Sequence, residues 1–205
     1  GMVCPFLEGM RFNIQHFWSR TVYKVGFWSG FIAFGSTVVF IITQILHFFG
    51  VFGYPLDEIL IYGFSLCIVI PFLLEILALH HIAPPEKKFW SHAALIFTVL
   101  YVAFVTANYV VQLATVIPMT LQGASDEILM LKQTPHSLFW DFDAIGYIIM
   151  EFATLFAVPI FEKQGFQRWV RYSFLVHSRP LAKVRDRSTE PIFVSVFNQS
   201  FIISK

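Results

Sequence analysis

Charged residues are scarce in this chain of 205 residues, because Asp, Glu, Lys and Arg make up only 13% of it. Soluble domains carry about a quarter charged residues. The shortage is local, since long apolar runs alternate with short charged connectors. This alternation is typical of several membrane-spanning helices rather than of an unusually apolar soluble core. We therefore expect an all-α fold, a polytopic transmembrane helical bundle.

Cysteine and net charge are also low, and each shortage excludes a class of protein. Cys4 and Cys67 cannot build a disulfide framework, a CxxC redox pair or a zinc ribbon. A net charge of +1 argues against nucleic acid as a partner. The chain has no P-loop and no GxSxG elbow, and no apolar run holds a lysine for a retinal Schiff base. No complete catalytic set is visible, so an enzyme is the least favoured class.

Four apolar stretches reach the roughly 20 residues that a helix needs to cross a bilayer. The predicted spans are residues 25–49, 56–82, 89–117 and 137–161, within a transmembrane domain of residues 25–162. Residues 1–24 come first, and the pattern of residues 6–18 predicts an amphipathic helix that lies in the membrane interface. Residues 163–205 predict either a basic cytoplasmic tail or a further span of a truncated five- or six-span protein.

Lys and Arg predict the orientation, because cytoplasmic connectors are enriched in them. One side of the predicted bundle carries Arg11, Arg20, Lys24, Lys87, Lys88, Lys163, Arg168 and Arg171, and the other side carries only Lys132. The sequence therefore predicts four spans with a cytoplasmic N-terminus, in the plasma (inner) membrane, with the lipid bilayer as the main partner.

Acidic residues interrupt the fourth span. Asp143, Tyr147 and Glu151 are four residues apart and share one helical face. Glu151 falls near the middle of the span, where an ionisable side chain must face protein or water. Polar residues of the first and third spans fall at matching depths. We therefore predict a polar cavity, open to the outside, that binds or translocates a small polar or cationic ligand or a proton; its lining is Glu151, Tyr147, Asp143, Asn108, Gln112 and Gln44.

Two alternatives remain open at this point. Asn and Gln often join membrane helices by hydrogen bonds without a further role, so the chain could be a structural or regulatory subunit that binds no ligand. Gly26 and Gly30 begin a GxxxG face in the first span. Such faces let helices approach closely, and this one predicts contact with a second copy of the chain or with a membrane partner.

The third alternative is a redox protein that binds haem b or a metal ion. Histidines occur at both ends of the predicted bundle, as His47 with His136 and as His80, His81 and His92. Haem ligands normally lie inside helices, however, and these residues lie at helix ends. A metal set of Glu75, His80 and His92 matches no known spacing. No cofactor is therefore predicted, and haem or metal is the less favoured expectation.

Two short segments carry a resemblance to known proteins. Asn108-Tyr109 with Gln112-Leu113, and Pro135-His136-Ser137 with Phe139-Trp140, resemble a group of uncharacterised multi-span integral membrane proteins. The resemblance covers the third and fourth spans, about half of the chain. It implies a membrane bundle, and it implies no activity and no catalytic residues.

Overall fold

The computed structural model describes the backbone of residues 5–124, 128–135 and 137–177, and the side chains from residue 20 onward within those ranges. These residues form helices and no strands. Four helical segments are long and apolar enough to cross a membrane, namely Arg20–Phe48, Leu56–Ile82, Pro85–Leu121 and Leu138–Ile160. The predicted all-α, four-span bundle is confirmed, and the chain is an integral membrane protein.

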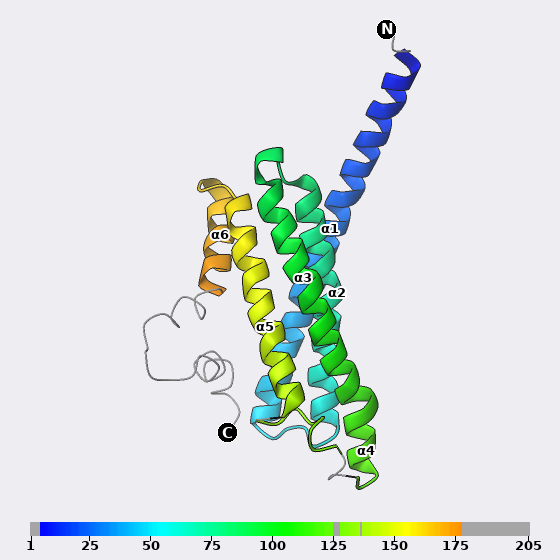
Figure 1. The fold of residues 1–205 in the computed structure, drawn as a ribbon, viewed down its shortest axis with the longest axis vertical. Helices are drawn as coiled ribbons and strands as arrows, with labels where there is room; N and C mark the ends of the chain where they lie inside the picture. The colour runs from blue at the N-terminus through cyan, green and yellow to red at the C-terminus, as the bar shows by residue number, and fades with distance from the viewer. Residues whose placement is uncertain (1–4, 125–127, 136, 178–205) are drawn as a thin grey trace.

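The elements follow one another along the chain with short connections. Their bounds are α1 Pro5–Phe48, α2 Leu56–Ile82, η1 Pro85–Lys87, α3 Lys88–Val111, η2 Gln112–Val116, α4 Ile117–Leu121, α5 Leu138–Ala157, η3 Val158–Ile160 and α6 Gly165–His177. Neighbouring spans pack in the order α1, α2, α3, α5, and α6 turns back along α5 (Figure 1). We call the end of the bundle with residues 49–55, 121–124 and 128–135 the distal end, and the end with residues 82–88 and 160–165 the proximal end.

The N-terminal segment and the first span form one helix. The sequence predicts a separate interfacial helix within residues 1–24, whereas α1 runs from Pro5 to Phe48 without a break (Figure 1). No glycine or proline lies between Gly9 and Gly26, so nothing in the local sequence ends the helix there. A location of its first turns in the membrane interface stays a prediction. Of the predicted tail, residues 165–177 form α6, and residues 178–205 lie outside the described residues.

The glycine face of α1 packs inside the chain. A Cβ atom added to Gly26 would lie 2.9 Å from Cβ of Ala78 on α2, and one added to Gly30 would lie 3.5 Å from the Glu75 carboxyl group. The two backbones approach closely because the glycines carry no side chain. Within the chain, α2 therefore covers the Gly26 and Gly30 face, and contact of this face with a second copy or a membrane partner stays a prediction.

The third span extends past the predicted end at residue 117. Residues Gln112–Val116 form a π-helical turn, in which the N–H of Ile117 donates to the carbonyl of Gln112, and α4 then continues to Leu121. Pro118 has no N–H, and its ring would clash with a carbonyl four residues earlier in a regular α-helix. The widened turn accommodates the proline, so the helix continues.

The start of α5 depends on a serine cap. The Ser137 hydroxyl accepts a hydrogen bond from the backbone N–H of Trp140 at 3.1 Å, and α5 begins one residue later. Loss of such a cap costs about 1 kcal/mol. We expect Ser137→Ala to lower the free energy of unfolding by about this amount, measured by denaturant titration in mixed micelles. Ser65→Ala is the control, because the Ser65 hydroxyl bonds only to the Ile61 carbonyl within the same helix. Equal losses in both variants would contradict a capping role.

Cationic side chains cover helix ends at the proximal end. Lys87 Nζ donates to the Ile160 carbonyl at 2.9 Å and to the Glu162 carboxylate at 2.7 Å. Arg171 donates to the carbonyls of Val158 and Phe161, both at 3.3 Å. Lys88 donates to the carbonyls of His80 and His81 at the end of α2. The last carbonyls of a helix have no partner within it, so these cations satisfy groups that would otherwise need water.

Candidate functional site

A polar cavity of about 340 Å³ opens at the distal end of the bundle. Its walls come from α2, from the π-turn η2 with α4, and from the connector that precedes α5. Charged, amide and hydroxyl side chains predominate in the lining, which consists of Tyr54, Glu58, Tyr62, Gln112, Val116, Thr120, Lys132, Gln133 and Thr134. The connector is held inward because Gln112 Nε2 donates to the Leu131 carbonyl at 2.7 Å. A π-turn in the wall is notable, since such turns occur frequently at functional sites.

A buried carboxylate lies behind the wall of this cavity. Asn108 Nδ2 on α3 donates to Asp143 Oδ1 on α5 at 3.0 Å, and both residues are almost fully buried. The side chains of Tyr109 and Gln133 lie close enough to the Asp143 carboxylate to interact with it. The Tyr109 hydroxyl lies 3.4 Å from that of Tyr147, one helical turn further along α5. Gln133 therefore lines the cavity and also lies near a hydrogen-bonded group of α3 and α5 side chains.

Several buried oxygen atoms around the cavity have no hydrogen-bond partner in the described part of the chain. They are Asn108 Oδ1, Thr120 Oγ1 and Gln133 Oε1. A carboxylate can only accept, so the amide nitrogen of Asn108 must face Asp143 and its oxygen is left over. Burial of an unpaired polar group costs about 1–3 kcal/mol. Thr120 and Gln133 belong to the lining, so the cavity offers their two unused oxygens to a molecule that donates hydrogen bonds.

Charge around the cavity is unbalanced. Lys132 lies close enough to Glu58 to attract its carboxylate electrostatically. No cation contributes to the interactions of Asp143, whose partners are the neutral groups of Tyr109, Asn108 and Gln133. Among the described side chains, Glu58 thus has a nearby cation, whereas Asp143 has none.

Glu151 does not line the distal cavity, although the sequence predicts it in the lining. Its Oε1 pairs with Nδ1 of His177 on α6 at 3.2 Å, and its Oε2 is buried without a partner in the described residues. The hydrogen bond that His177 donates to the Glu151 carboxylate raises the pKa of His177 above its usual value. Gln44 is also absent from the cavity lining, because α1 packs against α2 rather than against α3 and α5. Of the six predicted residues, Gln112 lines the cavity, and Asn108, Asp143 and Tyr147 form the group behind it.

The histidines make other contacts than those of a haem or metal site. His47 Nδ1 lies 2.9 Å from Asp57 Oδ2, an ion pair that joins the end of α1 to the start of α2. His80 Nδ1 lies 2.9 Å from the Ser91 hydroxyl, and its ring packs edge-on against His92. The described residues bring no three His, Cys, Asp or Glu side chains together around a metal position. Glu75, the third candidate ligand, faces Gly30 instead, and His136 lies outside the described residues.

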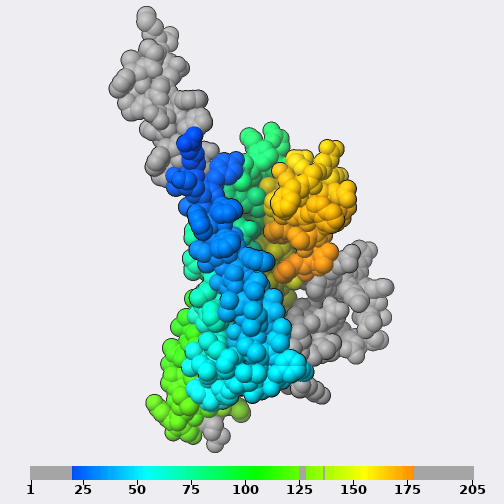
Figure 2. Space-filling view, turned by 180° about the vertical axis from the view of Figure 1, so that it is seen from behind, coloured from blue at the N-terminus to red at the C-terminus, as the bar shows by residue number. Residues whose placement is uncertain are grey.

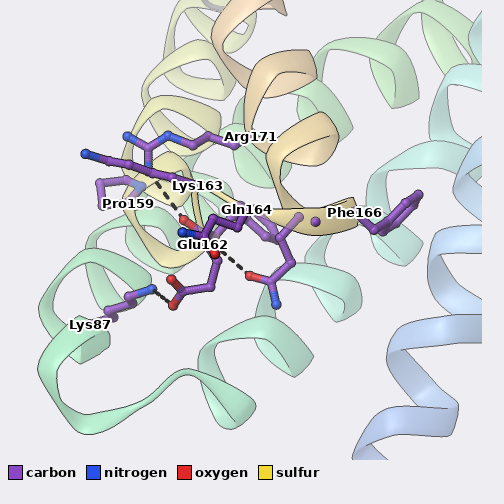
Figure 3. A pocket seen from close by; sticks show the side chains of 10 residues that line it. Lys87, Pro159, Glu162, Lys163, Gln164, Phe166 and Arg171 are labelled. Atoms are coloured by element: carbon purple, nitrogen blue, oxygen red, sulfur yellow. Dashed lines mark hydrogen bonds and ion pairs between the residues drawn. The ribbon is translucent and has the colours of Figure 1, made fainter.

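A larger depression of about 920 Å³ lies at the proximal end, around Lys87, Glu162, Lys163 and Arg171 (Figure 3). It is a weaker candidate, because Lys87 and Arg171 already bind carbonyl groups and Glu162. The hydrogen bond from Lys87 lowers the pKa of the exposed Glu162 carboxyl group. Lys87 and Arg171 of this depression therefore act as caps of helix ends.

Four residues of the cavity lining are not among those predicted from the sequence: Glu58, Tyr62, Lys132 and Gln133. Glu58 and Tyr62 are four residues apart on α2, so their shared face was readable from the sequence. Lys132 and Gln133 lie in a connector, and a connector has no periodicity that predicts where its side chains point. Only the hydrogen bonds of the folded connector reveal their place in the cavity wall.

Comparison of the chain with protein-family models, with curated proteins and with solved structures found no match. The fold and the site define the class: an integral membrane protein of four spanning helices with a polar, acceptor-rich cavity at one end of the bundle. The resemblance of its third and fourth spans to a multi-span family stays a prediction.

Proposed function

We propose that the distal cavity binds a small organic cation that donates hydrogen bonds, such as a primary ammonium or a guanidinium group. The observation that carries this proposal is the pair of unpartnered buried oxygens in the lining, on Thr120 and Gln133, together with Asp143 behind the wall, a carboxylate that no described cation neutralises. A volume of about 340 Å³ suits a small molecule, since ligand pockets begin at about 300 Å³.

The orientation follows from the distribution of Lys and Arg in the sequence. Lys24, Lys87, Lys88 and Arg171 belong to the proximal end, and Lys132 is the basic residue of the distal connector. Cytoplasmic ends of membrane proteins are enriched in Lys and Arg. The proposed orientation therefore has the N-terminus in the cytoplasm and the distal cavity open to the outside. The proposed location is the plasma (inner) membrane.

Binding by purified protein in detergent tests this proposal, by titration calorimetry with ethylammonium and guanidinium. Tetramethylammonium carries the charge without an N–H donor, and acetate reverses the charge. We expect the two N–H donors to bind, tetramethylammonium to bind more weakly and acetate not to bind. Asp143→Asn removes the negative charge behind the cavity wall, and an attraction between charges in a partly buried site still contributes more than about 1 kcal/mol, so ethylammonium binding should weaken by about tenfold.

Charge variants around the cavity give matched controls. Lys132→Met removes the cation of the lining and should strengthen ethylammonium binding. Glu86→Gln changes an exposed carboxylate at the proximal end and should have no effect. Acetate binding that Lys132→Met abolishes would overturn the proposal. A folded protein that binds none of the probes would favour the structural subunit, whose polar groups only join helices.

A further inference from the structure

A second cavity, of about 360 Å³, lies in the proximal half of the bundle between α1, α2 and α6. Figure 2 shows the face of the molecule on which α1 (blue) and α6 (orange) lie on either side of this groove. Aliphatic and aromatic side chains form almost all of its lining, among them Tyr23, Phe27, Leu79, Ile82, Val170 and Phe174. The groove exists because α1 packs on α2 and leaves α5 and α6 apart from it.

One carboxylate interrupts this apolar lining. Glu75 of α2 is half-buried in the groove, and its carboxyl carbon and Oε1 lie 3.5 Å from the point where a Cβ of Gly30 would be. The described residues form no hydrogen bond or ion pair with Glu75. No Lys, Arg or His belongs to the lining. Within the part of the chain that the structure describes, the groove therefore combines a single negative group with apolar walls and no cation.

We propose that this groove binds a hydrophobic amine, one protonated nitrogen on an apolar body, which enters from the bilayer between α1 and α6. The nitrogen pairs with Glu75, and the apolar body replaces lipid against the walls. The rings of Tyr23 and Phe27 add aromatic faces, which attract organic cations. A phospholipid fits less well, because its phosphate would bring a second negative charge to a lining without a cation.

This site is separate from the distal cavity, so the inference does not rest on the proposed function. Its lining shares no residue with that cavity, and Glu75 and Glu58 lie almost five helical turns apart on α2. The two sites also differ in chemistry. The distal cavity offers many acceptors to a small polar cation, whereas the groove offers one carboxylate and a large apolar surface.

The test is native mass spectrometry of protein released from phosphatidylcholine nanodiscs that contain octylamine or, as the neutral counterpart, 1-octanol. We expect one saturable octylamine adduct and no saturable octanol adduct. Glu75→Gln preserves the shape of the side chain and should weaken octylamine binding by about tenfold or more. Val170→Trp leaves Glu75 intact and fills the groove from α6, so it should also remove the adduct. Two variants on different helices keep the test valid if one of them fails to fold.

Controls separate this site from the distal cavity. The octylamine adduct should survive in Asp143→Asn and in the presence of excess ethylammonium, because both act at the distal cavity. Equal adducts with octanol and octylamine, or an unchanged adduct in folded Glu75→Gln protein, would overturn the proposal. An octylamine adduct lost in Asp143→Asn but kept in Glu75→Gln would place the amine in the distal cavity, which also overturns it.

Discussion

Replacement of Gly146 by leucine is expected to be the most destabilising single change in the bundle. A Cβ atom at this position would lie 2.8 Å from Cγ2 of Val105 on α3, and Val105 is itself fully buried. Overpacking of a core costs about 1–3 kcal/mol and occasionally more. A leucine adds three carbons beyond Cβ, so α3 and α5 must separate. We expect a loss at the upper end of that range, measured by denaturant titration in mixed micelles.

The separation of α3 and α5 also has a consequence for the distal cavity. Asn108 and Asp143 join these two helices, so Gly146→Leu should weaken ethylammonium binding as well as stability. Gly35→Leu is the matched control, because a Cβ at Gly35 meets nothing within 4 Å. We expect no more than a small change there. Similar losses in both variants would show that helix propensity, rather than the close approach of α3 and α5, determines the cost.

Removal of the His177 imidazole is expected to have the second largest effect. His177→Leu leaves the Glu151 carboxylate buried without its partner on α6. Breaking a fully buried ion pair costs about 3–5 kcal/mol, and solvent reduces this because the His177 side chain is 47% exposed. We therefore expect a loss of about 2 kcal/mol. The double variant Glu151→Leu with His177→Leu should be more stable than His177→Leu alone, because it leaves no unpaired charge. A double variant that loses the sum of both single effects would contradict this.

The same pair predicts how the docking of α6 depends on pH. The hydrogen bond that His177 donates to the Glu151 carboxylate raises the pKa of His177 above the unperturbed 6.5, so the folded state holds this proton more tightly than the unfolded state. The contribution of the pair is fully present below about pH 6.5 and is lost as the pH rises through the raised pKa of His177. Protease cleavage within α6 should therefore be slower at about pH 6 than at about pH 9. His177→Leu should abolish the difference, and a difference that persists in this variant would have another cause.

Matching of residues by depth along the third and fourth spans was correct only to within about one helical turn. The matched depths paired Asp143 with Gln112 and Tyr147 with Asn108, whereas in the structure Asp143 accepts a hydrogen bond from Asn108 at 3.0 Å. The comparison misplaced Gln44, because equal depth does not say which helices are neighbours. The series α1, α2, α3, α5 leaves the first span beside the second and away from the fourth.

The partner of Glu151 shows a different limit of sequence reasoning. An acid near the middle of a span predicts a protein contact, and Glu151 has one. The expected neighbours were the three other spans, but the contact comes from α6, a helix of 13 residues that turns back along α5. Sequence periodicity places Asp143, Tyr147 and Glu151 on one face, yet a single face can contact α3 at one level and α6 at another.

The amino-acid sequence by itself determined the class of fold, because apolar runs of this length satisfy their backbone hydrogen bonds in a bilayer as helices. It also determined which residues share a helical face, because the period of the helix is constant. The tertiary structure alone decided which faces meet, and therefore which acidic group belongs to the distal cavity. It also decided where Lys132 and Gln133 point, since the connector takes its shape from contacts such as Gln112 with Leu131 rather than from a local repeat.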